Sequence, residues 1–244
     1  MTRDRTDFDP ATALARITGA TSRLLATAAA FTDDDVRAPS LLPGWSRGHV
    51  LTHLARNADG GRNLLSWART GTKTPEYPSL TARDEQIASG AGRTAAELLA
   101  DLRACADAFE AEYRRMPPEA WQRPVRWTRG QEHPAARAAD ARLSELLIHH
   151  ADLDAGYTPA DWPPDFVSTM LGRVVASFTA RENAPAMRLR ATDTGARHTI
   201  GTERLPPTVA GPQHALLSWL LGRSPGTGLA VDHAATLPSP PFLY

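Results

Sequence analysis

Apolar residues recur at helical spacing through the first two thirds of the chain. Runs of this length and period predict four long helices, with a loop after the second and a short extended segment after the third. The predicted helices cover about residues 11–31, 46–69, 94–116 and 135–155. Helices of this length bury their apolar stripes most readily against one another, so the pattern favours a four-helix bundle.

The pattern changes after residue 157, where glycine and proline gather in Gly156–Pro159 and Trp162–Pro164. Beyond them, helical spacing predicts helices over about residues 165–182 and 212–221, and alternation predicts short strands over 187–192 and 198–200. We therefore expect an α+β protein with two domains. Residues 1–157 would form the four-helix bundle, and residues 158–244 a smaller α/β domain.

Composition narrows the class of protein. Lysine plus arginine and aspartate plus glutamate number 27 each, so the chain offers no excess positive charge to nucleic acid. The single cysteine, Cys105, excludes an internal disulfide and a cysteine-based zinc cluster, and fits a reducing cytoplasm. No apolar run approaches the ~20 residues of a membrane span. A cytoplasmic protein is expected, and the sequence leaves its oligomeric state open, with a monomer slightly favoured.

One candidate site stands out in the fourth helix. Glu145 and His149 are four residues apart, which places a carboxylate and an imidazole on one helix face. His53, from the second helix, would complete a set of two histidines and one carboxylate. Three protein ligands leave room for substrate or water on a zinc ion, as catalytic sites require, although other divalent ions also accept these ligands.

Each of these residues also has an ordinary structural interpretation. Glu145 and His149 could form an exposed helical ion pair, and a lone histidine such as His53 is commonly solvated or satisfied within a core. Two neighbouring histidines, His49 and His150, lie on other helix faces and are interpreted as structural.

Other polar residues near the candidate ligands have open roles. Asp152, one turn after His149, either orients a ligand imidazole or acts as a cap or as the partner of an arginine. Arg56 and Asn57 either reach the same cavity or line the bundle. Cys105 lies among apolar residues of the third predicted helix, where a buried, inert thiol is expected.

Several stretches of the chain resemble the mycothiol-dependent maleylpyruvate isomerase family. They are Ser-Leu-Leu-Pro-Gly-Trp-Ser-Arg-Gly-His-Val-Leu-Thr-His-Leu-Ala-Arg-Asn at 40–57, the segments at 67–77 and 82–87, and Arg-Leu-Ser-Glu-Leu-Leu-Ile-His-His-Ala-Asp-Leu at 142–153. The likeness continues to Gly222-Arg223 and the Pro-Pro pair at 240–241. The block at 44–53 is shared widely among DinB-like thiol-dependent metalloenzymes, whereas residues 67–87 are more discriminating.

This resemblance implies a DinB-like four-helix bundle with zinc held by His53, Glu145 and His149, and mycothiol as cofactor. It implies cis-trans isomerisation of maleylpyruvate to fumarylpyruvate, in gentisate degradation, by reversible addition of the thiolate to the alkene. It also implies that Arg223 is catalytic, since a guanidinium suits a substrate with two carboxylates. Arg223 alone would be interpreted as a cation at a helix C-terminus. The resemblance indicates no thiol-binding residues.

Two other functions remain open at this stage. Related zinc bundles with the same ligand pattern are thiol S-transferases, which join mycothiol or another small thiol to an electrophile. A non-enzymatic regulator or thiol-binding module could also keep the bundle. The complete set of three ligands argues against that last alternative.

Overall fold

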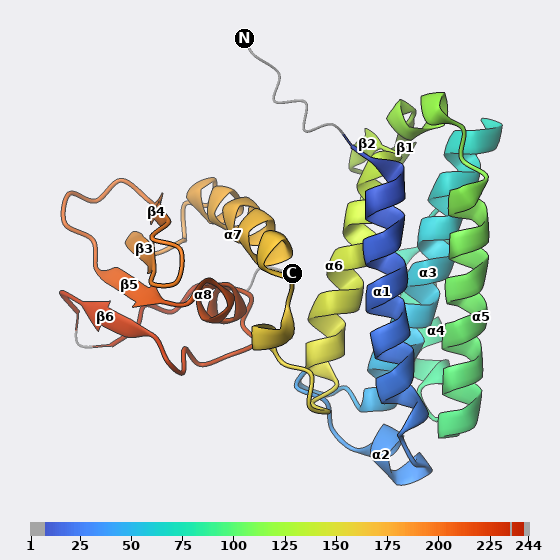
Figure 1. The fold of residues 1–244 in the computed structure, drawn as a ribbon, viewed down its shortest axis with the longest axis horizontal. Coiled ribbons are helices and arrows are strands. Elements are labelled where there is room, and N and C mark those ends of the chain that lie inside the picture. The colour runs from blue at the N-terminus through green and yellow to red at the C-terminus, as the bar shows by residue number, and fades with distance from the viewer. Residues whose placement is uncertain (1–7, 235, 242–244) are drawn as a thin grey trace. The chain divides into compact units, whose positions relative to one another are not determined.

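The computed structural model describes residues 8–234 and 236–241, and the chain divides between Gly156 and Tyr157 into two compact units (Figure 1). The first unit is helical and the second combines helices with a four-stranded sheet. The α+β class predicted from the sequence is therefore confirmed. Among the described residues, no helix has the length and apolar character needed to span a bilayer.

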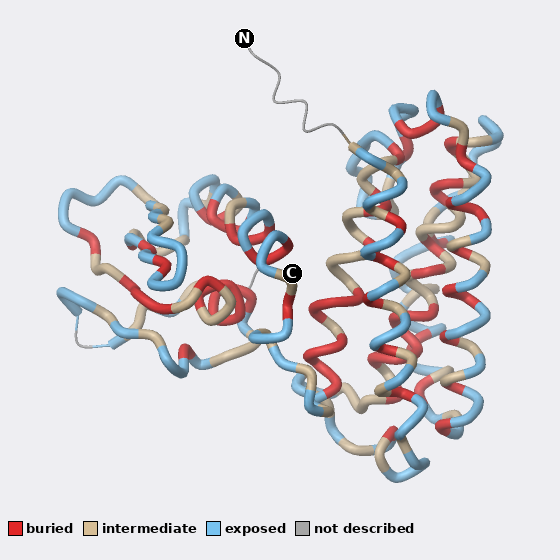
Figure 2. Tube along the Cα trace, viewed as in Figure 1, coloured by how far each residue is buried: buried red, intermediate tan, exposed pale blue. Residues whose placement is uncertain are grey.

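Four long helices lie side by side in the first unit: α1 (Pro10–Ala29), α3 (Arg47–Thr70), α5 (Ala95–Arg114) and α6 (Ala136–Asp152) (Figure 1). Each is within a few residues of its predicted bounds. Leu24, Leu54, Leu102 and Leu146, one from each helix, are almost completely buried. Buried residues recur along all four helices (Figure 2), as expected for amphipathic helices that share one core.

Polar residues define the ends of α3 and α6. The Ser46 side chain accepts a hydrogen bond from the His49 amide and begins α3. Arg47 then joins this end of α3 to the end of α6, because its Nε and Nη2 atoms donate to the carbonyls of Leu153 (2.6 Å) and Asp154 (2.7 Å). The start of α3 and the end of α6 are thus linked directly.

Two short helices of this unit lie outside the four long helices that the sequence predicted, and the second of them lies in the predicted loop. In α2 (Asp33–Arg37), the side chains of Thr32 and Asp35 cap each other's amides and so stabilise a single turn. In α4 (Leu80–Gly90), Ser79 caps the helix and Ile87 is the only buried residue, so no apolar stripe identifies it. The loop prediction for α4 was wrong for that reason.

The predicted extended segment after the third long helix is also present. A short 3-10 helix, η1 (Pro118–Gln122), leads into an antiparallel hairpin of β1 (Pro124–Arg126) and β2 (Glu132–Pro134). Val125 is the buried residue of β1.

The second unit begins with the 3-10 helix η2 (Pro159–Asp161). It then contains α7 (Pro164–Thr179), β3 (Met187–Ala191), β4 (Arg197–Ile200), β5 (Thr208–Gly211), α8 (Gln213–Leu220) and β6 (Ala230–Asp232). The strand order is β4-β3-β5-β6, with β3 parallel to β5 and the outer pairs antiparallel. Residues Met187, Leu189 and Ala191 of β3 are buried, while the residues between them are exposed. The strands β5 and β6 were not predicted. Three successive residues of β5 are buried, so it lacks the apolar-polar alternation of a half-buried strand, and β6 spans only three residues.

Candidate metal centre

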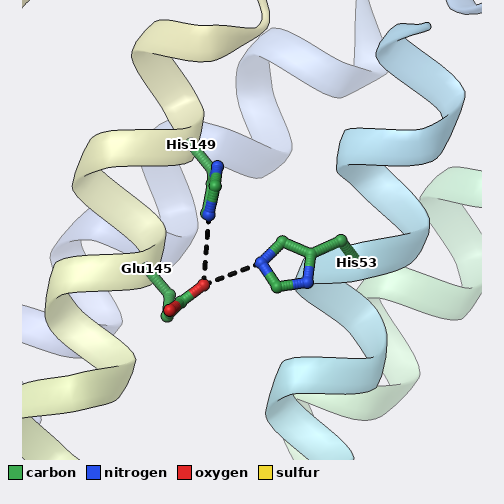
Figure 3. Close-up of side chains that lie close together, drawn as sticks. All are labelled: His53, Glu145 and His149. Atoms are coloured by element: carbon green, nitrogen blue, oxygen red, sulfur yellow. Dashed lines mark hydrogen bonds and ion pairs between the residues drawn. The ribbon is translucent and has the colours of Figure 1, made fainter. Parts of the chain in front are cut away.

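Two helices bring three potential ligands together inside the first unit. His53 extends from α3, and Glu145 and His149 extend from successive turns of α6 (Figure 3). Glu145 Oε2 lies 2.7 Å from His53 Nε2 and 3.2 Å from His149 Nε2. One ligand atom from each residue lies within 4.8 Å of the others. The convergence expected from the sequence is therefore present, although 92 residues separate His53 from Glu145.

The orientation of His149 is fixed by Asp152. The Nδ1 atom of His149 donates to Asp152 Oδ2 at 2.8 Å, and the Asp152 side chain is fully buried. This bond leaves Nε2 directed at Glu145. Of the two roles considered for Asp152, the structure shows the contact that orients an imidazole, an arrangement that recurs around protein metal sites. The Asp152 carbonyl also accepts from the Leu41 amide.

The three groups differ in charge. Burial alone would favour a neutral Glu145, but hydrogen bonds from His149 and His53 hold its pKa well below the ordinary range. Burial, with repulsion from His149, lowers the pKa of His53 to about 4. Burial also opposes the charged form of His149, but its bonds to Asp152 and Glu145 outweigh burial and raise its pKa to about 9. At neutral pH the cluster therefore contains a carboxylate, a neutral imidazole and an imidazolium.

Arg83, from the unpredicted helix α4, contacts the cluster directly. Its Nη2 lies 3.2 Å from His53 Nδ1, and its Nη1 bonds Asp84 at 2.7 Å. Because a guanidinium only donates, His53 Nδ1 must accept, and the ring hydrogen is on Nε2, facing Glu145. Arg83 also lies over the ring of Tyr77, a buried residue whose pKa is raised mainly by burial.

No motif or spacing in the sequence pointed to Arg83 or Tyr77 as site residues. Residues 67–87 were identified as the part of the resemblance that is most specific to the family. Because residues 80–90 were predicted to be a loop, however, Arg83 could not be placed relative to the bundle. Recognising Ser79 as a helix cap would have placed Arg83 in the first turn of α4.

The other candidates near the site have partners elsewhere. His49 Nδ1 contacts the Ser46 hydroxyl (2.8 Å), and His150 Nε2 contacts the Thr27 hydroxyl of α1 (2.8 Å). Both contacts are structural links, as the sequence indicated.

Arg56 and Asn57 also form contacts within the bundle. Arg56 Nη2 donates to Asp101 at 2.7 Å, and Asn57 Oδ1 accepts from Arg142 at 2.9 Å. Burial and neighbouring carboxylates raise the pKa of Cys105 to about 12, so this thiol remains protonated and unreactive.

Arg223 belongs to the second unit and follows α8. Gly222 adopts a left-handed φ of 71°, which lets the Gly222 and Arg223 amides bond the carbonyls of Trp219 and Ser218. Arg223 Nη1 donates to the Leu221 carbonyl at 2.8 Å. These contacts match the structural interpretation of a cation at a helix C-terminus, and the catalytic role remains a prediction.

Two protein-family models match this chain. The first, described as "Mycothiol maleylpyruvate isomerase N-terminal domain", matches residues 17–154, and the second, described as "MDMPI C-terminal domain", matches residues 161–240. The chain belongs to the mycothiol maleylpyruvate isomerase family. The family resemblance noted in the sequence is confirmed. A comparison with curated protein sequences finds no significant match.

Members of the mycothiol maleylpyruvate isomerase family also appear among solved structures. The crystal structure of the mycothiol-dependent maleylpyruvate isomerase is 26% identical, with a TM-score of 0.91 and coverage of 96% of this chain and 97% of that chain. A histidine-to-alanine mutant of that enzyme matches at 25% identity with the same TM-score and coverage. The sequence-based expectation of an enzyme of this family is confirmed.

The donor set of this family member fits a divalent metal ion. His53 is neutral and Glu145 is ionised, so two of the three groups already have the protonation state of a ligand. His149 needs to lose one proton, and its Nδ1 partner, Asp152, would hold the ring in place as it does so. Two imidazoles with one carboxylate leave coordination positions open for a further ligand.

Proposed function

We propose that this protein is a zinc- and mycothiol-dependent isomerase that converts maleylpyruvate to fumarylpyruvate, a late step of gentisate degradation. One observation carries the proposal: in a chain of this family, two imidazoles and a carboxylate from α3 and α6 lie within 4.8 Å of one another. Small thiols are kept reduced in the cytoplasm, so we propose that the reaction occurs there.

The ion would be held by His53 Nε2, the Glu145 carboxylate and His149 Nε2, and zinc suits this donor set, as do related divalent ions. A bound zinc ion would supply the positive charge that stabilises a thiol sulfur as a thiolate, the form whose reversible addition to the alkene would make the double bond temporarily single and free to rotate. The chain itself provides no competing nucleophile at Cys105, because that thiol is buried and protonated.

Arg83 is suited to binding a substrate carboxylate. In the structure, its guanidinium donates to His53 Nδ1. If His53 uses Nε2 as a ligand atom, the ring hydrogen moves to Nδ1, which can no longer accept from Arg83. The guanidinium is then released beside the metal centre, where it can form a charge-assisted bond to a carboxylate.

The proposed activity is tested by supplying the purified protein with zinc, mycothiol and maleylpyruvate, and following the alkene by ultraviolet absorbance. We expect turnover that requires both zinc and the thiol. A protein that leaves maleylpyruvate unchanged but joins mycothiol to another electrophile would be a transferase. Binding of zinc and thiol without consumption of any electrophile would indicate a binding module.

We propose that Arg223 acts in catalysis by stabilising negative charge on the substrate. The Arg223→Ala variant should keep its zinc content and lose turnover, by roughly 100-fold or more if the guanidinium stabilises charge in the transition state. Metal analysis and steady-state kinetics on the same sample measure both effects. Arg188→Ala, which removes an exposed arginine of β3, is the control and should retain full activity. Wild-type kcat in Arg223→Ala would leave Arg223 with only its role at the end of α8.

Metal binding should release about one proton per ion near neutral pH. Glu145 is already ionised and His53 already neutral, whereas His149, with a pKa of about 9, must deprotonate. Zinc affinity should therefore fall by roughly tenfold for each pH unit of acidification between about pH 9 and pH 4. Calorimetric titration in buffers with different heats of ionisation gives the proton count. Release of no proton, or of two, would contradict this charge assignment.

A further inference from the structure

Arg142 is a buried arginine on α6, one turn before Glu145, and the proposed chemistry does not use it. Only 2% of its surface is exposed. Burial lowers the pKa of Arg142 to about 10, with Glu145 acting in the opposite direction, so the guanidinium remains charged at neutral pH. A buried charge is costly unless bonds and nearby charges compensate for it. In the described part of the chain, Arg142 forms no ion pair and its Nη2 atom has no hydrogen-bond partner.

The bonds that Arg142 does form reach across to the other ligand helix. Its Nη1 atom donates to the Leu54 carbonyl (2.8 Å) and to Asn57 Oδ1 (2.9 Å), both on α3. Leu54 directly follows His53, and Asn57 lies four residues after His53 on the same helix face. The guanidinium therefore binds α3 beside His53, from a position on α6 that is one turn before Glu145.

Two arginines join α3 to α6, in addition to the 2.7 Å contact between His53 and Glu145. Arg47 joins the ends of α3 and α6, where it bonds Leu153 and Asp154. Arg142 joins the helices further along, beside His53 and Glu145. A fork-shaped donor can bond a main-chain carbonyl and a side-chain amide together, which fixes both the separation and the register of two helices.

We propose that Arg142 is a positioning residue for the metal centre, which sets the distance and register between His53 on α3 and Glu145 on α6. The proposal rests on the metal site described under the proposed function. Residues that hold metal ligands in place change metal affinity by roughly 10- to 100-fold when they are lost. Asp152 bonds a ligand side chain, that of His149, whereas Arg142 links the two helices that carry the ligands.

The test measures metal binding without any turnover. Zinc affinity is determined by competition with a chromogenic chelator, and the absorption spectrum of the cobalt-substituted protein reports ligand geometry. We expect Arg142→Met, which loses both donors and charge, to bind zinc roughly tenfold or more weakly and to alter the cobalt spectrum. Arg142→Lys, which keeps the charge and a donor, should lie between Arg142→Met and the wild type.

Arg123 provides a matched control. Its Nη1 donates to the carbonyls of Ala68 (2.9 Å) and Arg69 (3.2 Å), at the far end of α3 from His53. Arg123→Met should lower thermal stability and leave zinc affinity unchanged. Equal losses of affinity in Arg123→Met and Arg142→Met would reduce Arg142 to a general bundle contact and overturn the proposal.

Wild-type zinc affinity and an unchanged cobalt spectrum in folded Arg142→Met would also overturn the proposed positioning role. If Arg142→Met does not fold, Arg142→Lys and Asn57→Ala decide the matter, and both should bind zinc several-fold more weakly. Wild-type affinity in both of these variants would refute the positioning role. If the wild-type protein binds no zinc, the proposed metal site itself is wrong. That outcome is distinct from failure of the positioning role, in which the wild type binds zinc and the variants bind it equally well.

Discussion

Replacing Glu145 by glutamine should abolish tight metal binding and all turnover. The amide keeps the size of the side chain but removes the negative charge that the site needs to hold a cation between two imidazoles. We expect zinc affinity to fall by more than about 100-fold, since loss of a ligand should exceed the 10- to 100-fold effect of losing its supporting contacts. Zinc content after dialysis and activity on maleylpyruvate measure the two effects.

Glu132→Gln is the matched control for that substitution. Glu132 lies in β2 of the same unit with 56% of its side chain exposed, and its carboxylate lies 3.5 Å from the Arg126 guanidinium. This variant should retain its zinc and its activity. Retention of wild-type zinc affinity by Glu145→Gln, with an intact helical circular dichroism spectrum, would show that the carboxylate does not bind the ion.

Substitution of two helical glycines by alanine should have opposite effects on stability. A Cβ atom at Gly48, in the first turn of α3, would lie 2.4 Å from the main-chain oxygen of Ala91 and 3.2 Å from that of Val36. Main-chain atoms cannot rotate away, so Gly48→Ala should destabilise the fold by roughly 1–3 kcal/mol. Gly19, in α1, has nothing within 4 Å of the same position. Gly19→Ala should therefore stabilise it by roughly 0.5–1 kcal/mol.

Denaturant unfolding of both variants at one pH measures this difference. Because Gly48 lies five residues before His53, Gly48→Ala should also weaken zinc binding, whereas Gly19→Ala should not. Equal stability of the two variants would mean that α3 can shift away from Ala91 at little cost.

The sequence predicted the bundle well because its signals are local. Long apolar stripes identified α1, α3, α5 and α6, and the spacing of Glu145 and His149 placed both on one face of α6. Short elements escaped prediction: α4 buries only Ile87, and β6 is three residues long. Such segments are determined by contacts with the rest of the fold and not by their own periodicity.

The site was only partly predictable for a related reason. Spacing on α6 accounts for Glu145 and His149, but nothing local indicates that His53 lies against them. The sequence offered His53 only as the residue that would complete the ligand set, and the family resemblance implied the same three residues. The role of Asp152 stayed open because a carboxylate one turn from a histidine has several ordinary uses. Arg83 and Arg142 act across gaps of 30 and 88 residues, where no pattern in a single sequence reveals a contact.

The link that Arg47 forms between the start of α3 and the end of α6 bears on how the protein acquires its ion. Because this bond and the shared apolar core join both helices through protein groups alone, their alignment has a source besides metal coordination. Zinc need not drive folding, as it does in small zinc-dependent domains. We therefore expect chelation to leave a folded protein that rebinds zinc, so that the supply of the ion, and not the synthesis of new chains, would limit the recovery of activity.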